Sequence, residues 1–228
     1  MTKPPRCDTL SHDKKSARRH MILPGQFRLS DDAVGDSLHA GGFGHLVTPG
    51  PETLEVTSMP LLYNAEGNVL EGHLARTNPH WRYTGTSESL VILPGADAYV
   101  SPEFYPSKSV HGKVVPTWNY EVLYVYGQLV AHDDEQWLRA HVTALTARHE
   151  SGRENEWKVT DAPPQFVDAQ LRGIVGIELN VTRVYGKAKL NQNRSPADRS
   201  GVIRGLEKGS FSERETAAAM VAAGLDNG

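Results

Sequence analysis

The chain has 228 residues, of which 39% are hydrophobic and 22% charged, and its formal net charge at pH 7 is −3. This composition is typical of a globular protein, and the lack of an 18-residue apolar run excludes a membrane-spanning helix. The single cysteine, Cys7, excludes an internal disulfide, and without an apolar signal core near the start we expect a cytoplasmic protein.

Residues 1–20 form a basic, polar leader. They contain six Lys or Arg and two Asp, a balance of +4, so −3 minus +4 leaves about −7 for the remaining 208 residues. A polar run without apolar periodicity is typical of a disordered tail, and an arm that binds nucleic acid is the alternative. The negative body disfavours tight binding to phosphate backbones.

A short helix is expected over residues 31–40, because Ser30 can cap it and two aspartates occupy its first turn. Three β-leaning runs follow, separated by turns rich in proline, glycine and asparagine, and they predict two hairpins. The runs are residues 44–48, 53–62 and 69–75.

Two more short strands, residues 89–93 and 98–101, are expected to be separated by a Pro-Gly break. A longer strand, residues 119–131, is apolar on both faces, which favours the centre of a barrel or a subunit contact over a sheet edge.

The clearest predicted helix covers residues 133–149, with an aspartate cap and one broad apolar face. The last predicted helix is expected to begin with a capping box made by Ser212 and Glu215. The other elements expected in this half are a helix over 165–171, a strand over 174–185, and helices over 196–206 and 213–223.

The densest chemistry lies in residues 94–120, where rings, hydroxyls, amines and prolines are close together. The prolines predict a rigid irregular loop between strands, a common place for a binding site. Such a set suits an aromatic ligand that carries an anion. Its polar and aromatic members are Tyr99, Ser101, Phe104, Tyr105, Ser107, Lys108, His111, Lys113, Thr117, Trp118 and Tyr120.

Other site classes find little support. Ten histidines are scattered, without the i,i+4 spacing of a helical metal clamp, so no metal site is expected. No G-x-S-x-G elbow is present, and the glycine cluster of residues 41–44 follows a helix rather than a strand, which disfavours a dinucleotide fingerprint. The terminal helices carry mixed charges and give no basic face for a helix-turn-helix.

Two further segments, residues 72–81 and 186–194, carry groups suited to phosphate. Charge-assisted hydrogen bonds to phosphate are stronger than neutral ones. The candidate sets are Lys108 with Ser101 and Ser107, Arg76 with Asn78, and Lys189 with Asn191.

The segments DAYVSPEFYPSK and GKVVPTWNY, preceded by GHLARTNPHW and followed by KLNQNR, resemble the PaiB-type FMN-binding negative transcriptional regulators over about residues 21–225. The resemblance implies a flavin-reductase-like split β-barrel, related to pyridoxamine-phosphate-oxidase-like proteins. It also implies that two subunits pair and that FMN lies at their interface.

In oxidase relatives, a strand ending in Tyr-Thr-Asn leads into a Ser-Arg-Lys run that grips the flavin phosphate. Here Tyr99-Val100-Ser101 leads into Ser107-Lys108, a similar layout with one cation fewer. The sequence offers no pair with evident acid and base roles, so the catalytic residues of the enzyme alternative are unknown; His73, His111 or Lys113 could serve there as a proton donor or substrate anchor. The cofactor-binding candidates are His73, Arg76, Asn78, Ser101, Tyr105, Ser107, Lys108, Lys113, Val115, Pro116, Thr117, Trp118, Asn119 and Lys189.

We therefore expect a mainly β protein with helices: a leader over residues 1–20, an FMN-binding split barrel over 21–190, and a helical appendage over 191–228 packed on the barrel. The expected function is that of a cytoplasmic, homodimeric, FMN-binding transcriptional regulator, with DNA as a weakly supported partner and no membrane contact. The alternatives are a flavin-dependent oxidoreductase (a flavin reductase or oxidase), a haem-handling split-barrel enzyme, or a barrel that has lost its flavin and serves as an interaction scaffold.

Overall fold

A computed structural model of the chain describes residues 23–85 and 87–226. The expected leader, residues 1–20, lies outside them. None of the helices in the described residues has the length and apolar character that spanning a bilayer needs.

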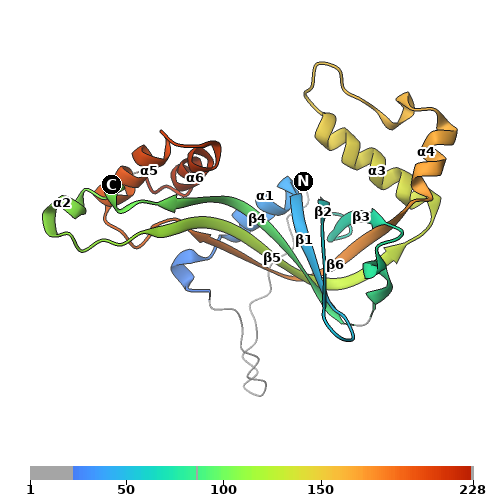
Figure 1. Ribbon diagram of the computed structural model, residues 1–228, viewed down its shortest axis with the longest axis horizontal. Coiled ribbons are helices and arrows are strands. Elements are labelled where there is room, and N and C mark those ends of the chain that lie inside the picture. Colours follow the sequence, from blue (N-terminus) through green and yellow to red (C-terminus); the bar gives the residue numbers. More distant parts are fainter. Residues whose placement is uncertain (1–22, 86, 227–228) are drawn as a thin grey trace. The chain divides into compact units, whose positions relative to one another are not determined.

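Six strands form a closed barrel in the order β1-β2-β3-β6-β5-β4 (Figure 1). The pairings β1–β2, β2–β3, β3–β6 and β1–β4 are antiparallel. The strands are β1 (Gly42–Pro49), β2 (Leu54–Asn64), β3 (Val69–Ala75), β4 (Glu88–Val100), β5 (Thr117–His132) and β6 (Ile174–Lys189). The helices are α1 (Asp31–Ala40), α2 (Ser107–His111), α3 (Glu135–Glu150), α4 (Pro164–Leu171), α5 (Pro196–Leu206) and α6 (Phe211–Ala222).

The chain forms two compact units. The barrel unit comprises residues 35–93 and 124–184, and the C-terminal unit comprises the described residues of 1–34, 94–123 and 185–228. The strands β4, β5 and β6 contribute residues to both units.

The barrel unit contains the pairings that close the barrel. Its core is built from inward-facing aliphatic side chains, because alternate residues of a strand face the same side. The buried members include Leu46, Met59, Leu61, Leu70, Leu74, Val91, Val125, Leu129, Ile177 and Leu179.

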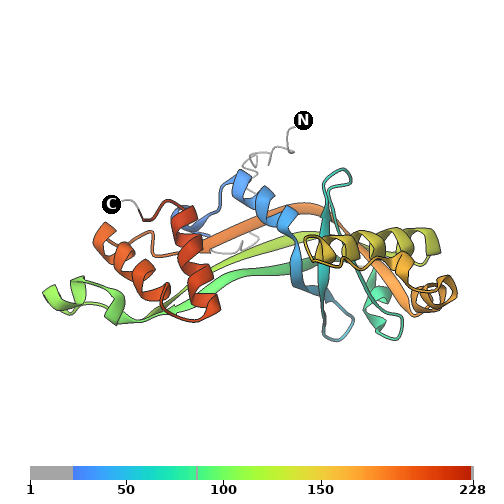
Figure 2. The ribbon, with the colours of Figure 1, turned by 90° about the horizontal axis from the view of Figure 1, so that it is seen from above.

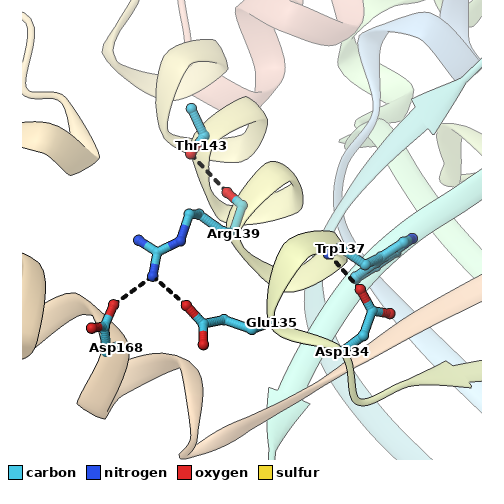
Figure 3. A network of polar contacts seen from close by, with 6 residues as sticks. All are labelled: Asp134, Glu135, Trp137, Arg139, Thr143 and Asp168. Atoms are coloured by element: carbon cyan, nitrogen blue, oxygen red, sulfur yellow. Dashed lines mark hydrogen bonds and ion pairs between the residues drawn. The ribbon is translucent and has the colours of Figure 1, made fainter.

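Helices α3 and α4 lie side by side in the barrel unit (Figure 2). Asp134 caps α3 by accepting a hydrogen bond from the Trp137 amide at 2.7 Å. Arg139 donates to Glu135 at 2.7 Å and to Asp168 of α4 at 2.5 Å, whereas Trp137 projects from the opposite side of α3 (Figure 3).

In the C-terminal unit, α5 and α6 cover one face of the strand ends of β4, β5 and β6 (Figure 1). Ser107 anchors α2 to α5, because its amide and hydroxyl both donate to the Asp198 carboxylate at 3.0 and 2.9 Å. The buried cluster is Ala98, Val100, Tyr105, Ala188, Leu190, Val202, Ile203, Leu206, Ala217 and Met220.

Most predicted elements are confirmed, including the helix over 31–40, the two hairpins and the non-edge position of the strand over 119–131. The predicted break at the Pro-Gly pair is wrong, because β4 runs unbroken through Pro94 and Gly95. The pairing of β4 with β1 covers only residues 90–92, so the missing amide hydrogen of Pro94 breaks no bond to β1. Residues 94–120 therefore comprise two strand ends, two short helices and the irregular segment 112–116, rather than one irregular loop.

The predicted capping box is also misplaced by two residues. Ser210, not Ser212, accepts from the Glu213 amide, and the Glu213 carboxylate accepts from the Ser210 amide at 2.7 Å. The Ser-x-x-Glu pattern occurs twice in this segment, and Ser212 instead donates to the Asp97 carbonyl on β4.

Candidate functional site

The predicted cofactor-binding residues fall into two groups, one in each unit. Three of them, His73, Arg76 and Asn78, belong to the barrel unit, and the other eleven belong to the C-terminal unit. The structure therefore gathers most of the candidates in the C-terminal unit, within or after the segment that the sequence marks as chemically dense.

The C-terminal unit has one face of its strand ends open to solvent. Because α5 and α6 cover the side on which Ala98, Asn119 and Ala188 are buried, the alternate residues of the same strands face the other way. We call this open side the aromatic–cation face. It consists of Tyr99 on β4, Trp118 and Tyr120 on β5, and Lys187 and Lys189 on β6.

Two rings of this face, Tyr99 and Trp118, are exposed and in contact, whereas Tyr120 is half-buried. Trp118 is 54% exposed and Tyr99 is 46% exposed, and their ring centroids lie 6.1 Å apart in an edge-to-face arrangement. Next to them, the Lys187 ammonium lies 5.1 Å from the centroid of the Tyr120 ring. Large rings left in water at this density are typical of a ligand or partner site.

Lys189 is the best-positioned cation of the face. Its ammonium donates to Thr117 Oγ1 at 2.6 Å and to the Trp118 carbonyl. Burial lowers the pKa of Lys189, and the neighbouring charges of Lys187 and Arg194 lower it further. None of these three cations forms a salt bridge within the part of the chain that the structure describes.

Sequence reasoning selected Lys189, Thr117 and Trp118 but missed Lys187 and Arg194. The alternation of a strand would have found Lys187, because residues two apart on β6 share a face. Arg194 follows β6 in a loop, and its guanidinium lies 5.1 Å from the centroid of the Tyr105 ring.

Other candidates of the C-terminal unit face its core. Tyr105 is 2% exposed, and its hydroxyl accepts from Asn191 Nδ2 at 3.2 Å. Asn119 is fully buried, and its side-chain amide donates to the sulfur of Met220. Both side chains therefore support the strand ends from the side opposite the aromatic–cation face.

The hydroxyls of Ser101 and Ser107 have partners within the protein. Ser101 Oγ accepts from the Glu103 amide at 3.2 Å, and Ser107 Oγ donates to Asp198. Burial tends to raise the pKa of Asp198, but the hydrogen bonds from Ser107 and Ser195 hold it below its ordinary value.

Lys108 lies at the start of α2 and forms an ion pair with Glu103 at 3.1 Å. Both side chains are largely exposed, and such pairs contribute little to stability, so a stronger anion can displace the carboxylate. Lys113, Val115 and Pro116 are exposed in the segment that leads into β5.

In the barrel unit, Arg76 and Asn78 are occupied by protein groups. Arg76 donates to Asp133 and to the carbonyls of Arg172 and Ile174. The hydrogen bond from Arg76 lowers the pKa of Asp133. Asn78 caps the 3-10 helix Pro79–Tyr83 by accepting from the His80 amide at 3.0 Å.

His73 is half-buried on β3, and its Nδ1 lies 3.1 Å from Nε2 of His141 on α3. Burial lowers the pKa of His73. No group of three or more His, Cys, Asp or Glu that could hold a metal ion occurs among residues 23–85 and 87–226.

A cavity of about 490 Å³ also lies in the barrel unit. Its lining includes Arg139, Thr143, Trp157, Val159 and Pro164, and none of these is among the predicted site residues.

The family described as "Putative FMN-binding domain" matches residues 21–183. The chain belongs to this PaiB-type FMN-binding family. The resemblance inferred from the motifs is therefore confirmed, and with it FMN as the cofactor. The matched segment ends before Lys187, so the cations of the aromatic–cation face lie outside it.

Two relatives illustrate the range of this similarity. The chain is 28% identical over 191 residues to "Protease synthase and sporulation protein PAI 2" of Bacillus subtilis, covering 82% of this chain and 89% of that protein. It is 31% identical over 173 residues to an uncharacterized protein of Aspergillus fumigatus, covering 61% of this chain and 66% of that protein.

Solved structures agree on the fold. The flavocytochrome Anf3 from Azotobacter vinelandii superposes with a TM-score of 0.56 at 10% identity, covering 76% of this chain and 74% of that chain. An FAD- and heme-binding protein from Mycobacterium smegmatis gives a TM-score of 0.51 at 16% identity, covering 70% and 71%. The predicted fold class, a mainly β split barrel with helices, is confirmed.

Proposed function

We propose that the aromatic–cation face binds FMN in this PaiB-type protein. The observation that carries the proposal is the presence of cations without salt bridges beside two exposed rings on one uncovered strand face. FMN has the matching chemistry, a planar ring system and a phosphate that is close to doubly negative at neutral pH.

In this proposal Lys187 and Lys189 hold the phosphate, and Arg194, beside the Tyr105 ring, adds to the positive potential around Lys189. Lys189 has its pKa lowered by burial and by the other two cations, so a bound dianion would relieve their mutual repulsion and favour the charged ammonium. Thr117 Oγ1 fixes the position of the Lys189 ammonium before the ligand arrives, which reduces the entropy lost on binding.

The exposed rings of Trp118 and Tyr99 would contact the planar part of the cofactor and exclude water from one side of it. Lys113, Val115 and Pro116 precede this surface in the chain and remain candidates for the ribityl chain. Lys108, Ser101 and Ser107 remain candidates for a second phosphate contact. Bound FMN would supply one- and two-electron redox chemistry, which none of these side chains has.

The test is a fluorescence titration of the purified chain with FMN and with riboflavin, which lacks the phosphate. Hydrogen bonds to charged groups contribute about 1.5–3 kcal/mol each. Two such bonds, from Lys187 and Lys189, should therefore make FMN bind at least about 100-fold more tightly than riboflavin. High salt should remove most of that difference. Equal affinities for the two flavins would contradict a phosphate site made of cations.

A homodimer is the assembly we propose. The outer face of the β1–β2 hairpin exposes Phe43 by 62%, Leu54 by 60% and Val56 by 60%, and the register places all three on the same side. An apolar strand face of this kind is costly in water and is typical of a subunit contact.

Sedimentation tests this assembly. The chain should sediment at about 50 kDa, twice its mass of 25.0 kDa, and Val56→Lys should shift it toward the monomer. A matched Val110→Lys variant, at an 81% exposed residue of α2, should not change the mass. A monomer at micromolar concentration would remove the basis for a subunit contact on this hairpin.

The regulatory role is carried by the resemblance of the motifs to transcriptional regulators, and we propose it for the flavin-bound protein. A gel-shift assay with the protein's own upstream DNA tests direct repression, and the shift should weaken steeply with salt. Bleaching of the bound flavin by NADH or NADPH would instead favour an oxidoreductase.

A further inference from the structure

The barrel unit holds a stacked group of imidazole and indole rings that plays no part in the proposed flavin site. It lies where α3 packs on the sheet. We call it the histidine cluster, and it consists of Glu71 and His73 on β3, His132 on β5, Trp137 and His141 on α3, and Glu178 on β6.

Trp137 organises the cluster. Its ring lies 4.3 Å from that of His132 with planes 3° apart, and 5.1 Å from that of His141 with planes 15° apart. Trp137 and His141 are one turn apart on α3 and so point the same way. Gly176 of β6 makes room for the indole, because a Cβ there would lie 2.2 Å from Trp137 Cζ3.

Two histidines of the cluster, buried His141 and half-buried His132, each face a glutamate. His141 Nδ1 lies 3.7 Å from Glu71 Oε2, and His132 Nε2 lies 3.4 Å from Glu178 Oε2. Neither nitrogen has a hydrogen-bond partner among the described residues, so each glutamate acts on its imidazole through its charge. Glu71 and Glu178 are directly opposite in the β3–β6 register. Glu71 is held by Asn64, whose side-chain amide donates to Oε1 at 3.0 Å.

Among the described residues, only the imidazole beside Glu71 has a second imidazole within hydrogen-bond distance. His141 Nε2 lies 3.1 Å from Nδ1 of His73, so Glu71, His141 and His73 form a chain of three side chains. His141 is 2% exposed and His73 is half-buried. Nε2 of His73 has no hydrogen bond to any of the described residues.

The carboxylate decides where the protons of this chain lie. An ionised glutamate can only accept, so the favourable form of His141 carries its proton on Nδ1, toward Glu71. Nε2 of His141 must then accept, and Nδ1 of His73 must donate to it. The reverse arrangement would place a buried nitrogen lone pair against a negative charge, which is costly in a desolvated site.

We propose that Glu71, His141 and His73 form a relay that fixes His73 as a proton acceptor, with the lone pair of Nε2 open to an O–H or N–H acid. When the acid gives up its proton, its bonding electron pair stays on its own oxygen or nitrogen. A new N–H bond forms at Nε2, and no electron is transferred. The resulting imidazolium keeps its Nδ1–H bond to His141, and the Glu71 charge at the far end stabilises it.

Desolvation keeps the two imidazoles of the relay neutral. Burial lowers the pKa of His73, and burial together with His73 lowers that of His141 to about 4, so both rings are neutral and the lone pair is free at pH 7. Glu178 and His132 pair with each other beside Trp137 and are not part of the chain of three. The relay lies within the barrel unit, so its test requires no flavin.

The experiment is ring-nitrogen NMR of the full chain at pH 7, which identifies the protonated nitrogen of each histidine. His73→Gln assigns the signals. We expect His73 with a proton on Nδ1 and an unprotonated Nε2. Finding the proton on Nε2 in the unmodified chain overturns the proposal, whether or not any variant folds.

Two variants separate the relay from mere packing. Glu71→Gln removes the charge that holds the proton on His141 Nδ1, so His73 should populate the form protonated at Nε2. Its reaction with diethyl pyrocarbonate, which needs a free imidazole lone pair, should slow severalfold. Glu178→Gln removes the opposite carboxylate and should change neither signal nor rate at His73. Equal effects of the two substitutions, or no effect of Glu71→Gln, would overturn the relay.

Discussion

The aromatic–cation face and the histidine cluster both combine aromatic rings with titratable groups, but they differ in whether those groups have a partner of opposite charge. Lys187, Lys189 and Arg194 form no salt bridge within the described part of the chain, and Trp118 and Tyr99 of the face are exposed to solvent. In the histidine cluster His132 and His141 each have a carboxylate within 3.7 Å.

The face therefore has cations available to an external anion, whereas the cluster contains its own carboxylates, Glu71 and Glu178. Lys187 and Lys189 are like charges held close together, and such a pair raises the free energy of the protein until an anion binds. Paired imidazoles and carboxylates have no such need, and their protons can move within the group. We therefore assign external ligand binding to the face and proton handling to the cluster.

The largest expected effect is loss of FMN binding when the cations of the face are removed. Lys187→Ala with Lys189→Ala should weaken FMN at least about 100-fold, because two charge-assisted contacts of about 1.5–3 kcal/mol are lost. Riboflavin affinity should change little. A fluorescence titration measures both, and Lys158→Ala with Lys208→Ala serves as a charge-matched control. An equal loss for both flavins would assign the lysines to the fold.

The next effect is a dependence of the free energy of unfolding on pH, which tests whether buried His141 stays neutral in the folded chain. His141 has a folded-state pKa of about 4, below its ordinary value of 6.5, so the unfolded chain binds the extra proton between these values. Stability should therefore fall as the pH drops below about 6.5, by about 2 kcal/mol between pH 7 and 5. Urea unfolding at the two pH values measures it.

Two variants test whether His141 causes this pH dependence of stability. His141→Gln should remove most of it, whereas His149→Gln, at an exposed position of the same helix, should leave it intact. A dependence that survives in His141→Gln would show that other groups hold the protons.

A smaller effect is expected from closing the space that Trp137 occupies. Gly176→Ala would place a Cβ against an indole that stacks with two imidazoles, at a cost of about 2 kcal/mol. Gly35→Ala in α1 has open space around its Cβ and should be neutral or stabilising. Thermal unfolding compares them. Equal melting temperatures would mean that the indole can move aside, and the cluster would be less rigid than its stacking indicates.

The fold was largely predictable because its signals are local. Alternation along residues 174–185, caps such as Ser30 and turn residues between strands act over a few positions, and the expected elements match the structure closely. The break at Pro94 was mispredicted because its outcome depends on which neighbour a strand has, and strand pairing is not local.

In the candidate site too, residues with local signals could be predicted and residues that depend on non-local packing could not. Lys189 and Trp118 could be found from their residue types and from resemblance, and Lys187 from strand alternation. The link between Glu71 and His141 could not be found, because it joins residues 70 positions apart through the packing of α3 on the sheet. Tyr105 and Asn119 have suitable chemistry but are buried toward α5 and α6, which composition does not reveal.

The smallest expected effect concerns Lys108, which tests whether the phosphate site extends beyond the face. Its ammonium is exposed and already paired with Glu103, and an exposed pair of this kind is worth about 0–1 kcal/mol. Moving the ammonium from the carboxylate to a phosphate therefore exchanges one solvated ion pair for another. Lys108→Ala should weaken FMN binding by less than about fivefold, with riboflavin binding unchanged.

Glu103→Gln frees the Lys108 ammonium and should strengthen FMN binding slightly. A loss in Lys108→Ala as large as that of the double lysine variant would move the phosphate site to α2 and leave Lys187 and Lys189 without a ligand.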